Sequence, residues 1–332
     1  MRFILILFLS LISFEIKSFE KKQSFCDFNV NEYIHELRNS NYVEEIKVDV
    51  NDYKKWTINN LRILTDFREN IRTEDKKRFK SKVTVKYKFG KCVYKARIRQ
   101  HGDWKDHINY NKNNVYIDQS INVRLSEGNI LGITEFILFL PFTRNGNNEI
   151  LTTLLLNEFN ILAPRSFLFN TNINGNTSKM LFQEKIRKEF LEINNRKEGP
   201  ILEGDEELIW SYGVDTDDTK FKAFESVSLG RLNNVNWSFR NNTNILNSQK
   251  ALTKLQEIYL LYSSSMISNK HNLILNYNLL SNYNSSLRDK WLIFDILLMS
   301  LTAEHAMRPH NRKFYWNVLY DGFEPIYYDG NS

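Results

Sequence analysis

The densest group of chemically capable side chains lies near the end of the chain. Glu304, His305, His310 and Asn311 occur within one short stretch, and Asp329 follows after an apolar segment. Phosphoryl transfer needs a carboxylate, and often an amide oxygen, to hold Mg²⁺, together with a group that orients the nucleophile. An asparagine followed across a hairpin by an Asp-Gly pair could supply those ligands. The histidines could instead be core residues, but their clustering favours function.

Two arginines form a second candidate site. Arg97 and Arg99 are two positions apart in an expected strand, so their side chains share a face. Guanidinium groups in that arrangement can hold a phosphate through forked hydrogen bonds. Gly102 in the following loop would let the backbone approach a ligand closely. Taken alone, the pattern favours the simpler alternative of an exposed basic strand face and an ordinary turn.

Two further pairs of polar residues are weaker candidates. Glu184 and Lys185 stand where a strand is expected to run into a helix, and either could orient a phosphate-binding partner. The alternative is a solvated ion pair at a helix start, where the dipole favours glutamate. Glu203 and Asp205 would suit a glycan-acting enzyme that uses paired carboxylates, although an ordinary loop explains them better. The sequence contains no Walker-type glycine loop and no Gly-x-Ser-x-Gly motif.

Hairpins and separate helices must position these residues. Alternating apolar and polar residues around turn sequences predict hairpins at residues 82–98, 166–183 and 314–328. The strongest helix is expected at 148–159, and its apolar face is expected to contain Ile150, Leu151, Leu154, Leu155 and Phe159. Further helices are expected at 252–267 and 290–301. This mixture predicts an α+β fold with antiparallel hairpins and segregated helices.

The N-terminus predicts export. A basic start, the apolar run Phe3 to Phe14 and a small residue at Ser18 are typical of a secretory signal peptide over residues 1–18. An uncleaved N-terminal anchor is the alternative. No later segment is apolar enough to span a membrane after the signal is removed. We therefore expect a periplasmic or extracellular protein of the cell envelope.

Charge and cysteine content narrow the choice of partners. The formal net charge is +6, a mild excess that could favour anionic ligands or have no functional meaning. No basic run is dense enough to indicate nucleic acid, and export argues against it. The chain has two cysteines, Cys26 and Cys92, which in an exported protein could form one disulfide. Two unpaired thiols are the alternative.

Several motifs, taken in order, resemble the spore-coat CotH family of kinase-like proteins. The matching stretches are Arg97–Trp104, Asn122–Leu125, Ala163–Ser166, Phe182–Ile186, His310-Asn311 and Tyr328-Asp329. The resemblance covers about residues 83–332. It implies an atypical protein-kinase-like fold over residues 81–332, preceded by the signal peptide and by an N-terminal helical and extended region at 19–80. It also implies that the protein binds ATP and Mg²⁺ or Mn²⁺ and phosphorylates secreted or cell-surface proteins.

The resemblance assigns roles to particular positions. Asp329 resembles the metal-binding aspartate, and Asn311 resembles the catalytic-loop asparagine that also holds the metal. Glu304, with His305 beside it, is the candidate base. The residues expected on the nucleotide side are Arg97, Arg99, Arg124, Glu184 and Lys185.

The sequence also departs from the family pattern. The glycine loop reads Gln-His-Gly-Asp-Trp instead of Arg-Gly-Asn-Ser, and Met307 occupies the position of the catalytic aspartate. The sequence ends soon after Asp329, so either it is a fragment or the C-terminal part of the fold is missing. These departures favour the alternative of an envelope structural or binding module that keeps the fold without catalysis.

Overall fold

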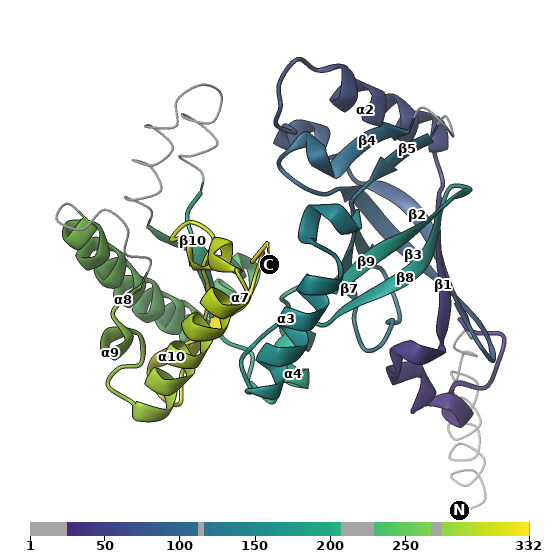
Figure 1. Ribbon diagram of the computed structural model, residues 1–332. Helices are drawn as coiled ribbons and strands as arrows, with labels where there is room; N and C mark the ends of the chain where they lie inside the picture. The colour runs from purple at the N-terminus through teal and green to yellow at the C-terminus, as the bar shows by residue number, and fades with distance from the viewer. Residues whose placement is uncertain (1–24, 112–115, 207–228, 267–273, 332) are drawn as a thin grey trace, which may run out of the picture.

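The computed structural model describes residues 25–111, 116–206, 229–266 and 274–331. The expected signal peptide at residues 1–18 lies outside the described residues. Figure 1 shows a strand-rich N-terminal half beside a C-terminal half in which helices predominate, with α3 (Asn147–Glu158) and α4 (Lys188–Ile193) between them. The two halves have separate hydrophobic cores.

A closed barrel of seven strands forms the N-terminal half, in the order β1-β2-β3-β6-β7-β9-β8. Its strands are β1 (Val43–Val50), β2 (Phe79–Tyr87), β3 (Gly90–Gln100), β6 (Ile121–Leu125), β7 (Glu135–Phe139), β8 (Ser166–Ile173) and β9 (Asn176–Glu184). Apolar side chains alternate along these strands, and the inward-facing ones, such as Val83, Val85 and Val123, fill the interior. The hairpins expected at 82–98 and 166–183 are confirmed as β2–β3 and β8–β9.

The expected kinase-like fold is wrong, because a closed barrel is not a kinase-like lobe. Closure depends on β1, which pairs antiparallel with β2 and parallel with β8. The sequence analysis placed β1 in a separate region at 19–80. The boundary expected at residue 80 falls inside β2, and the structure joins β1 to the barrel by continuous pairing.

A disulfide between Cys26 and Cys92 attaches the first described residues to β3, which confirms the expected pair. Backbone hydrogen bonds run beside it, from Val93 N–H to the Phe25 carbonyl and from Asp27 N–H to the Lys91 carbonyl. The bond is consistent with an exported protein, since such bonds persist in oxidising compartments. Within the ranges described above, no helix has both the length and the apolar character that crossing a bilayer requires.

Helix α2 (Tyr53–Thr65) and a small hairpin, β4 (Ile108–Asn111) with β5 (Tyr116–Gln119), lie together at one end of the barrel. Asp52 caps the start of the helix, and its carboxylate accepts a hydrogen bond from Lys55 N–H. Trp56 turns inward from the helix and packs edge-on against Phe79.

The C-terminal half contains a four-stranded antiparallel sheet and the longest helices. The sheet has the order β11 (Gly230–Leu232), β10 (Ile201–Gly204), β12 (Lys313–Asn317) and β13 (Gly322–Ile326). Against it lie α7 (Val235–Ser238), α8 (Asn242–Met266), α9 (Tyr277–Leu280) and α10 (Ser285–Ser300). Beneath the sheet, Asp295 and Arg312 form a buried ion pair at 3.2 Å. The hairpin expected at 314–328 is confirmed as β12–β13.

Helix α3 joins the two halves through a polar face. Glu149 is fully buried. Its carboxylate accepts one hydrogen bond from Tyr327 Oη of the C-terminal half, at 2.5 Å, and one from Gln183 Nε2 of the barrel, at 2.6 Å. The helix forms where it was expected, but its expected apolar face is not the buried one. Leu151 and Leu154 are more than half exposed. The buried face forms hydrogen bonds between the halves, so hydrophobic periodicity did not reveal it.

Candidate functional site

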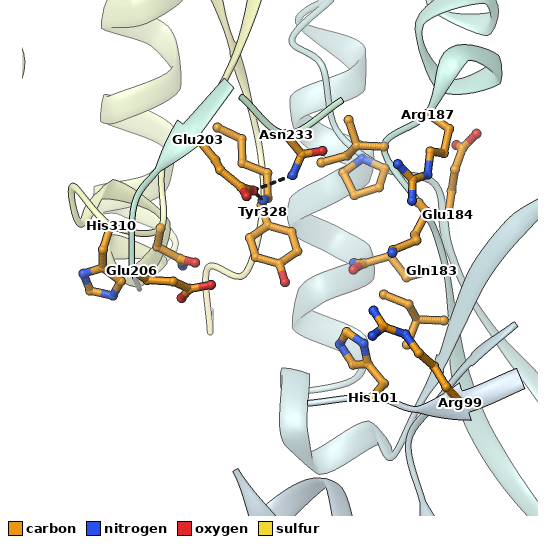
Figure 2. A pocket seen from close by; sticks show the side chains of 16 residues that line it. Arg99, His101, Gln183, Glu184, Arg187, Glu203, Glu206, Asn233, His310 and Tyr328 are labelled. Carbon is orange, nitrogen blue, oxygen red and sulfur yellow. Dashed lines mark hydrogen bonds and ion pairs between the residues drawn. The ribbon is translucent and has the colours of Figure 1, made fainter. Parts of the chain in front are cut away.

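Two adjoining cavities lie between the barrel and the C-terminal sheet, with volumes of about 260 Å³ and about 340 Å³. We call the first the upper cavity and the second the lower cavity. His101, Glu206, His310, Asn311 and Tyr328 line both. Figure 2 shows Tyr328 extending from the C-terminal half into the space opposite His101 and Arg99 of the barrel. The two cavities therefore form one cleft with one wall from each half.

The barrel wall of the upper cavity is basic. Lys185 and Arg187 follow β9, and both contact the carboxylate of Glu135 on β7, at 3.2 Å and 3.1 Å. Burial lowers the pKa of Lys185 to about 8, although Glu135 pulls it upward. Arg99 on β3 lines the same wall. The single carboxylate of Glu135 therefore faces three cationic side chains, so this wall has a net positive charge.

Arg99 is the least compensated of these cations. Its guanidinium has no hydrogen-bond or ion-pair partner among the described residues, although the side chain is partly buried. Burial and the neighbouring Arg78 lower its pKa, and the carboxylates of Glu135 and Asp103 offset this only in part. Burying an uncompensated charge is costly unless another group pairs with it. Arg99 is therefore the strongest sign of an anion-binding position.

The other arginines expected at this site lie elsewhere. Arg97 shares the outward face of β3 with Arg99, and it stands opposite Arg124 of β6. Both side chains are exposed, and neither lines the upper or the lower cavity. The alternation along β3 indicated the correct face, but it did not show how far along the strand the cleft extends.

Glu184 lines the upper cavity as expected, but its carboxylate is fully engaged by an arginine. Arg165 donates from Nε to Oε2 at 2.8 Å and from Nη2 to Oε1 at 2.9 Å. Arg165 also donates to the carbonyl of Leu131. Since Glu184 is buried and bound at both oxygens, it fixes the Ala-Pro-Arg segment to β9 and adds no free negative charge to the cleft.

The opposite wall contains a carboxylate whose charge is neutralised by neighbouring cations. Glu203 on β10 contacts Lys313 and Arg231 and accepts a hydrogen bond from Asn233. Burial opposes its ionisation, but Lys313 and Arg231 outweigh burial and lower the pKa of Glu203 to about 2. A glycosidase acid needs a raised pKa. The arrangement therefore gives no support to the glycan-hydrolysing alternative that paired Glu203 with Asp205.

The predicted Asn311 and Asp329 come together at the lower cavity. The Asn311 amide donates to the carbonyls of His305 and Asp329, at 3.2 Å and 3.1 Å. The carboxylate of Asp329 lies 2.6 Å from Nη1 of Arg144. Gly204 allows this segment to approach β10, because a Cβ there would lie 1.8 Å from the carbonyl oxygen of Pro309. Asn311 and Asp329 are therefore neighbours as expected, but the partner of the Asp329 carboxylate is an arginine.

These residues do not fit a resident Mg²⁺ or Mn²⁺. Such an ion needs carboxylate oxygens at about 2.1 Å in octahedral geometry. The Asp329 carboxylate is already paired with a guanidinium, and a second cation beside Arg144 would be repelled. Among the residues that the structure describes, no group of three or more histidine, cysteine or acidic side chains could hold a metal ion.

The expected base is not positioned for catalysis. Glu304 is exposed and lines neither cavity. His305 lines the lower cavity, and its Nε2 lies 3.8 Å from Asp329. Burial lowers the pKa of His305, so its neutral form is favoured. Met307, at the position of the family's aspartate, is buried in the C-terminal core.

Three cleft residues were missed by the sequence analysis. Arg187 continues the strand-like spacing of two from Lys185, a signal that matches the Arg97 and Arg99 pair. Tyr328 fell in a matching stretch but received no role, and Arg144 received none either, because their roles depend on contact between distant segments. Gly102 lines the lower cavity, and a Cβ there would lie 2.0 Å from the ring of His107, so the glycine also accommodates that ring.

The fold and the cleft define a barrel-containing protein with a basic, anion-attracting wall between its two halves. Comparison with models of known families gives no match, and comparison with curated proteins also gives none. The function must therefore be inferred from the cleft itself.

Proposed function

We propose that this protein binds a nucleoside phosphate in the cleft, with the phosphates on the basic wall. The observation that carries the proposal is the partly buried guanidinium of Arg99, which lines the cavity and has no partner among the described residues. Arginine is well suited to this role because its planar fork matches phosphate oxygens. Lys185 and Arg187 extend the same positive surface.

The rest of the upper cavity suits the organic part of such a ligand. Ile137, Pro164 and Ile186 line it and offer apolar surface to a base. The two adjoining cavities, of about 260 Å³ and about 340 Å³, are comparable with pockets for small molecules, which have volumes of about 300–1,000 Å³. ATP, which the family resemblance implies, is the first ligand to test.

Binding is better supported than phosphoryl transfer. Glu304 is outside the cleft, Met307 is in the core, and the Asp329 carboxylate is paired with Arg144. We therefore favour the binding module over the kinase. Phosphorylation of a secreted or surface protein, and the Mg²⁺ or Mn²⁺ that it would use, stay predictions. The periplasmic or extracellular location also stays a prediction, supported by the Cys26–Cys92 bond.

Calorimetric titration of the folded protein tests the proposal. ATP, ADP and inorganic phosphate would each be added with and without Mg²⁺. We expect ATP to bind, and Arg99→Ala to weaken it at least about tenfold, since a hydrogen bond to a charged group contributes about 1.5–3 kcal/mol. Arg97→Ala is the matched control, because Arg97 lies on the same strand face outside the cleft. Equal affinities for the two variants would contradict the proposal.

Transfer can be tested separately from binding. The protein would be incubated with labelled ATP and a mixture of secreted proteins. Label that enters an acceptor, and that is lost in Arg99→Ala but kept in Arg97→Ala, would restore the kinase alternative. ATP binding without incorporation would support the binding module.

A further inference from the structure

A third cavity, beside α2 and separate from the cleft, contains a different set of side chains. It has a volume of about 190 Å³ and lies between α2, the β4–β5 hairpin and the turn between β8 and β9. We call it the aromatic groove and define it by Tyr53, Tyr110, Tyr116, Asn60 and Gln119. It shares no lining residue with the cleft.

Aromatic rings surround the mouth of the groove. Tyr53 on α2 is 52% exposed, and Tyr110 and Tyr116 of the hairpin are 43% and 41% exposed. The indole of Trp56 lines the groove from below. Tyrosine combines a flat apolar ring with a hydroxyl and favours surfaces that are half apolar and half wet. Three such rings around one cavity provide stacking surfaces for a flat or ring-shaped ligand.

Two buried amides at the groove have an oxygen without a partner. Asn60 is 2% exposed and Gln119 is 3% exposed, and neither Asn60 Oδ1 nor Gln119 Oε1 has a hydrogen-bond partner among the described residues. A buried polar group without a partner costs about 1–3 kcal/mol and calls for an explanation. Both residues line the cavity, but these two oxygens are themselves enclosed, so a bound molecule would meet the amides at their other atoms.

The groove is also uncharged. Its described lining residues include no acidic, basic or histidine side chain. Its polar groups are amides and hydroxyls, including those of Thr57, Asn174 and Asn176. This lining offers no ionic partner to a phosphate, in contrast to the basic wall of the cleft. It matches a neutral ligand that has hydroxyl groups on its edges and C–H groups on its faces.

We propose that the aromatic groove binds a neutral oligosaccharide. The tyrosine rings would stack on the C–H faces of sugar rings, and the amide NH2 groups of Asn60 and Gln119 would donate hydrogen bonds to sugar hydroxyls. A site built to hydrogen-bond hydroxyl groups rejects molecules that lack them, because its buried polar atoms are then left unpaired. The small volume suits a sugar ring better than a nucleotide. The inference is independent of the nucleoside phosphate proposal.

Titration of the full, disulfide-bonded protein with cellotetraose, chitotetraose, maltotetraose and mannotetraose tests the inference. We expect one of them to bind and Tyr53→Ala to weaken it about tenfold. Tyr320→Ala is the matched control, because Tyr320 is also 52% exposed but lies outside the groove. Arg99→Ala is expected to leave sugar binding unchanged, which separates this site from the cleft.

A second variant distinguishes recognition from folding. Gln119→Leu removes the buried amide, so we expect the melting temperature to stay the same or rise while sugar affinity falls about tenfold. A purely structural glutamine would not show this combination. The inference is overturned if no oligosaccharide binds, if Tyr320→Ala weakens binding as much as Tyr53→Ala, or if a short proline-rich peptide binds the groove and the sugars do not.

Discussion

The guanidinium of Arg144 lies 2.6 Å from the carboxylate of Asp329, and the two side chains are largely buried. Arg144 ends a short helical turn (Pro141–Arg144) beside the barrel, whereas Asp329 follows the last strand of the C-terminal half. Burial disfavours the charged arginine, but Asp329 outweighs burial and raises the pKa of Arg144. The carboxylate expected to hold a metal therefore holds the two halves of the protein together.

The first prediction concerns this ion pair. Asp329→Ala leaves a buried guanidinium without its counter-ion, so we expect the free energy of unfolding to fall by about 3 kcal/mol. Urea denaturation would measure it. Glu192→Ala is the control, because it breaks a surface pair with Lys188 in which both side chains are 54% exposed. That change should be below about 0.5 kcal/mol. A similar small effect for Asp329→Ala would contradict the role assigned to the pair.

The second prediction concerns the pH dependence of ligand binding. A phosphate interacts best with protonated Lys185, whose pKa is about 8. We expect affinity for ATP to be greatest below that pH and to fall as the pH rises through it, because the lysine then loses its charge. Lys185→Arg should keep its affinity above this pH, since a guanidinium stays protonated. A decline of equal size in both proteins would exclude Lys185 as its cause.

The third prediction concerns acid stability. The pKa of Glu203 in the folded protein, about 2, lies below the ordinary value of 4.5. Its ionised form therefore stabilises the fold above pH 4.5, and this contribution is lost as the pH falls towards about 2. Glu203→Gln is expected to be less stable than wild type near neutrality and to approach it at the acid end. Denaturation would be measured across this pH range. If the pairing with Lys313 and Arg231 contributed nothing, the difference in free energy of unfolding between the two proteins would not change with pH.

The fourth prediction concerns the disulfide. The bond joins residues separated by 66 positions, and a loop of this size is expected to contribute about 4 kcal/mol. Cys26→Ala with Cys92→Ala should lower the free energy of unfolding by that order. Reductant should destabilise the wild-type protein and leave the double variant unchanged. An equal response of the two proteins to reductant would show that the bond is not formed.

Local pattern predicted the hairpins but not the barrel. Alternation and turn residues located β2–β3 and β8–β9, because both partners lie close together in sequence. Strand β1 also alternates, with Ile46, Val48 and Val50 inside, but its second partner is β8, more than a hundred residues later. No local rule specifies such a pairing. The architecture was therefore predicted wrongly although most of its pieces were found.

The site was predicted in part for a similar reason. Motif order selected Arg99, Glu184, Lys185, Asn311 and Asp329, and all five line the cleft. It also selected Arg97 and Arg124, which lie on the same barrel surface beyond the cavity. Residue type indicated ionic groups, but only the fold shows which charges are already paired. In the fold, Glu184 is paired with Arg165, whereas Arg99 has no partner among the described residues.

The parallel pairing of β1 with β8 has a consequence for how the chain folds during synthesis. The ribosome releases β1 well before residues 166–173. Until β8 is made, one edge of β1 has no strand to pair with. A nascent chain with such an edge can join another chain and aggregate. We expect assembly to be slow, because the last contact to form spans so much sequence. A chaperone that binds residues 43–50 until β8 has been translated would increase the yield of folded molecules.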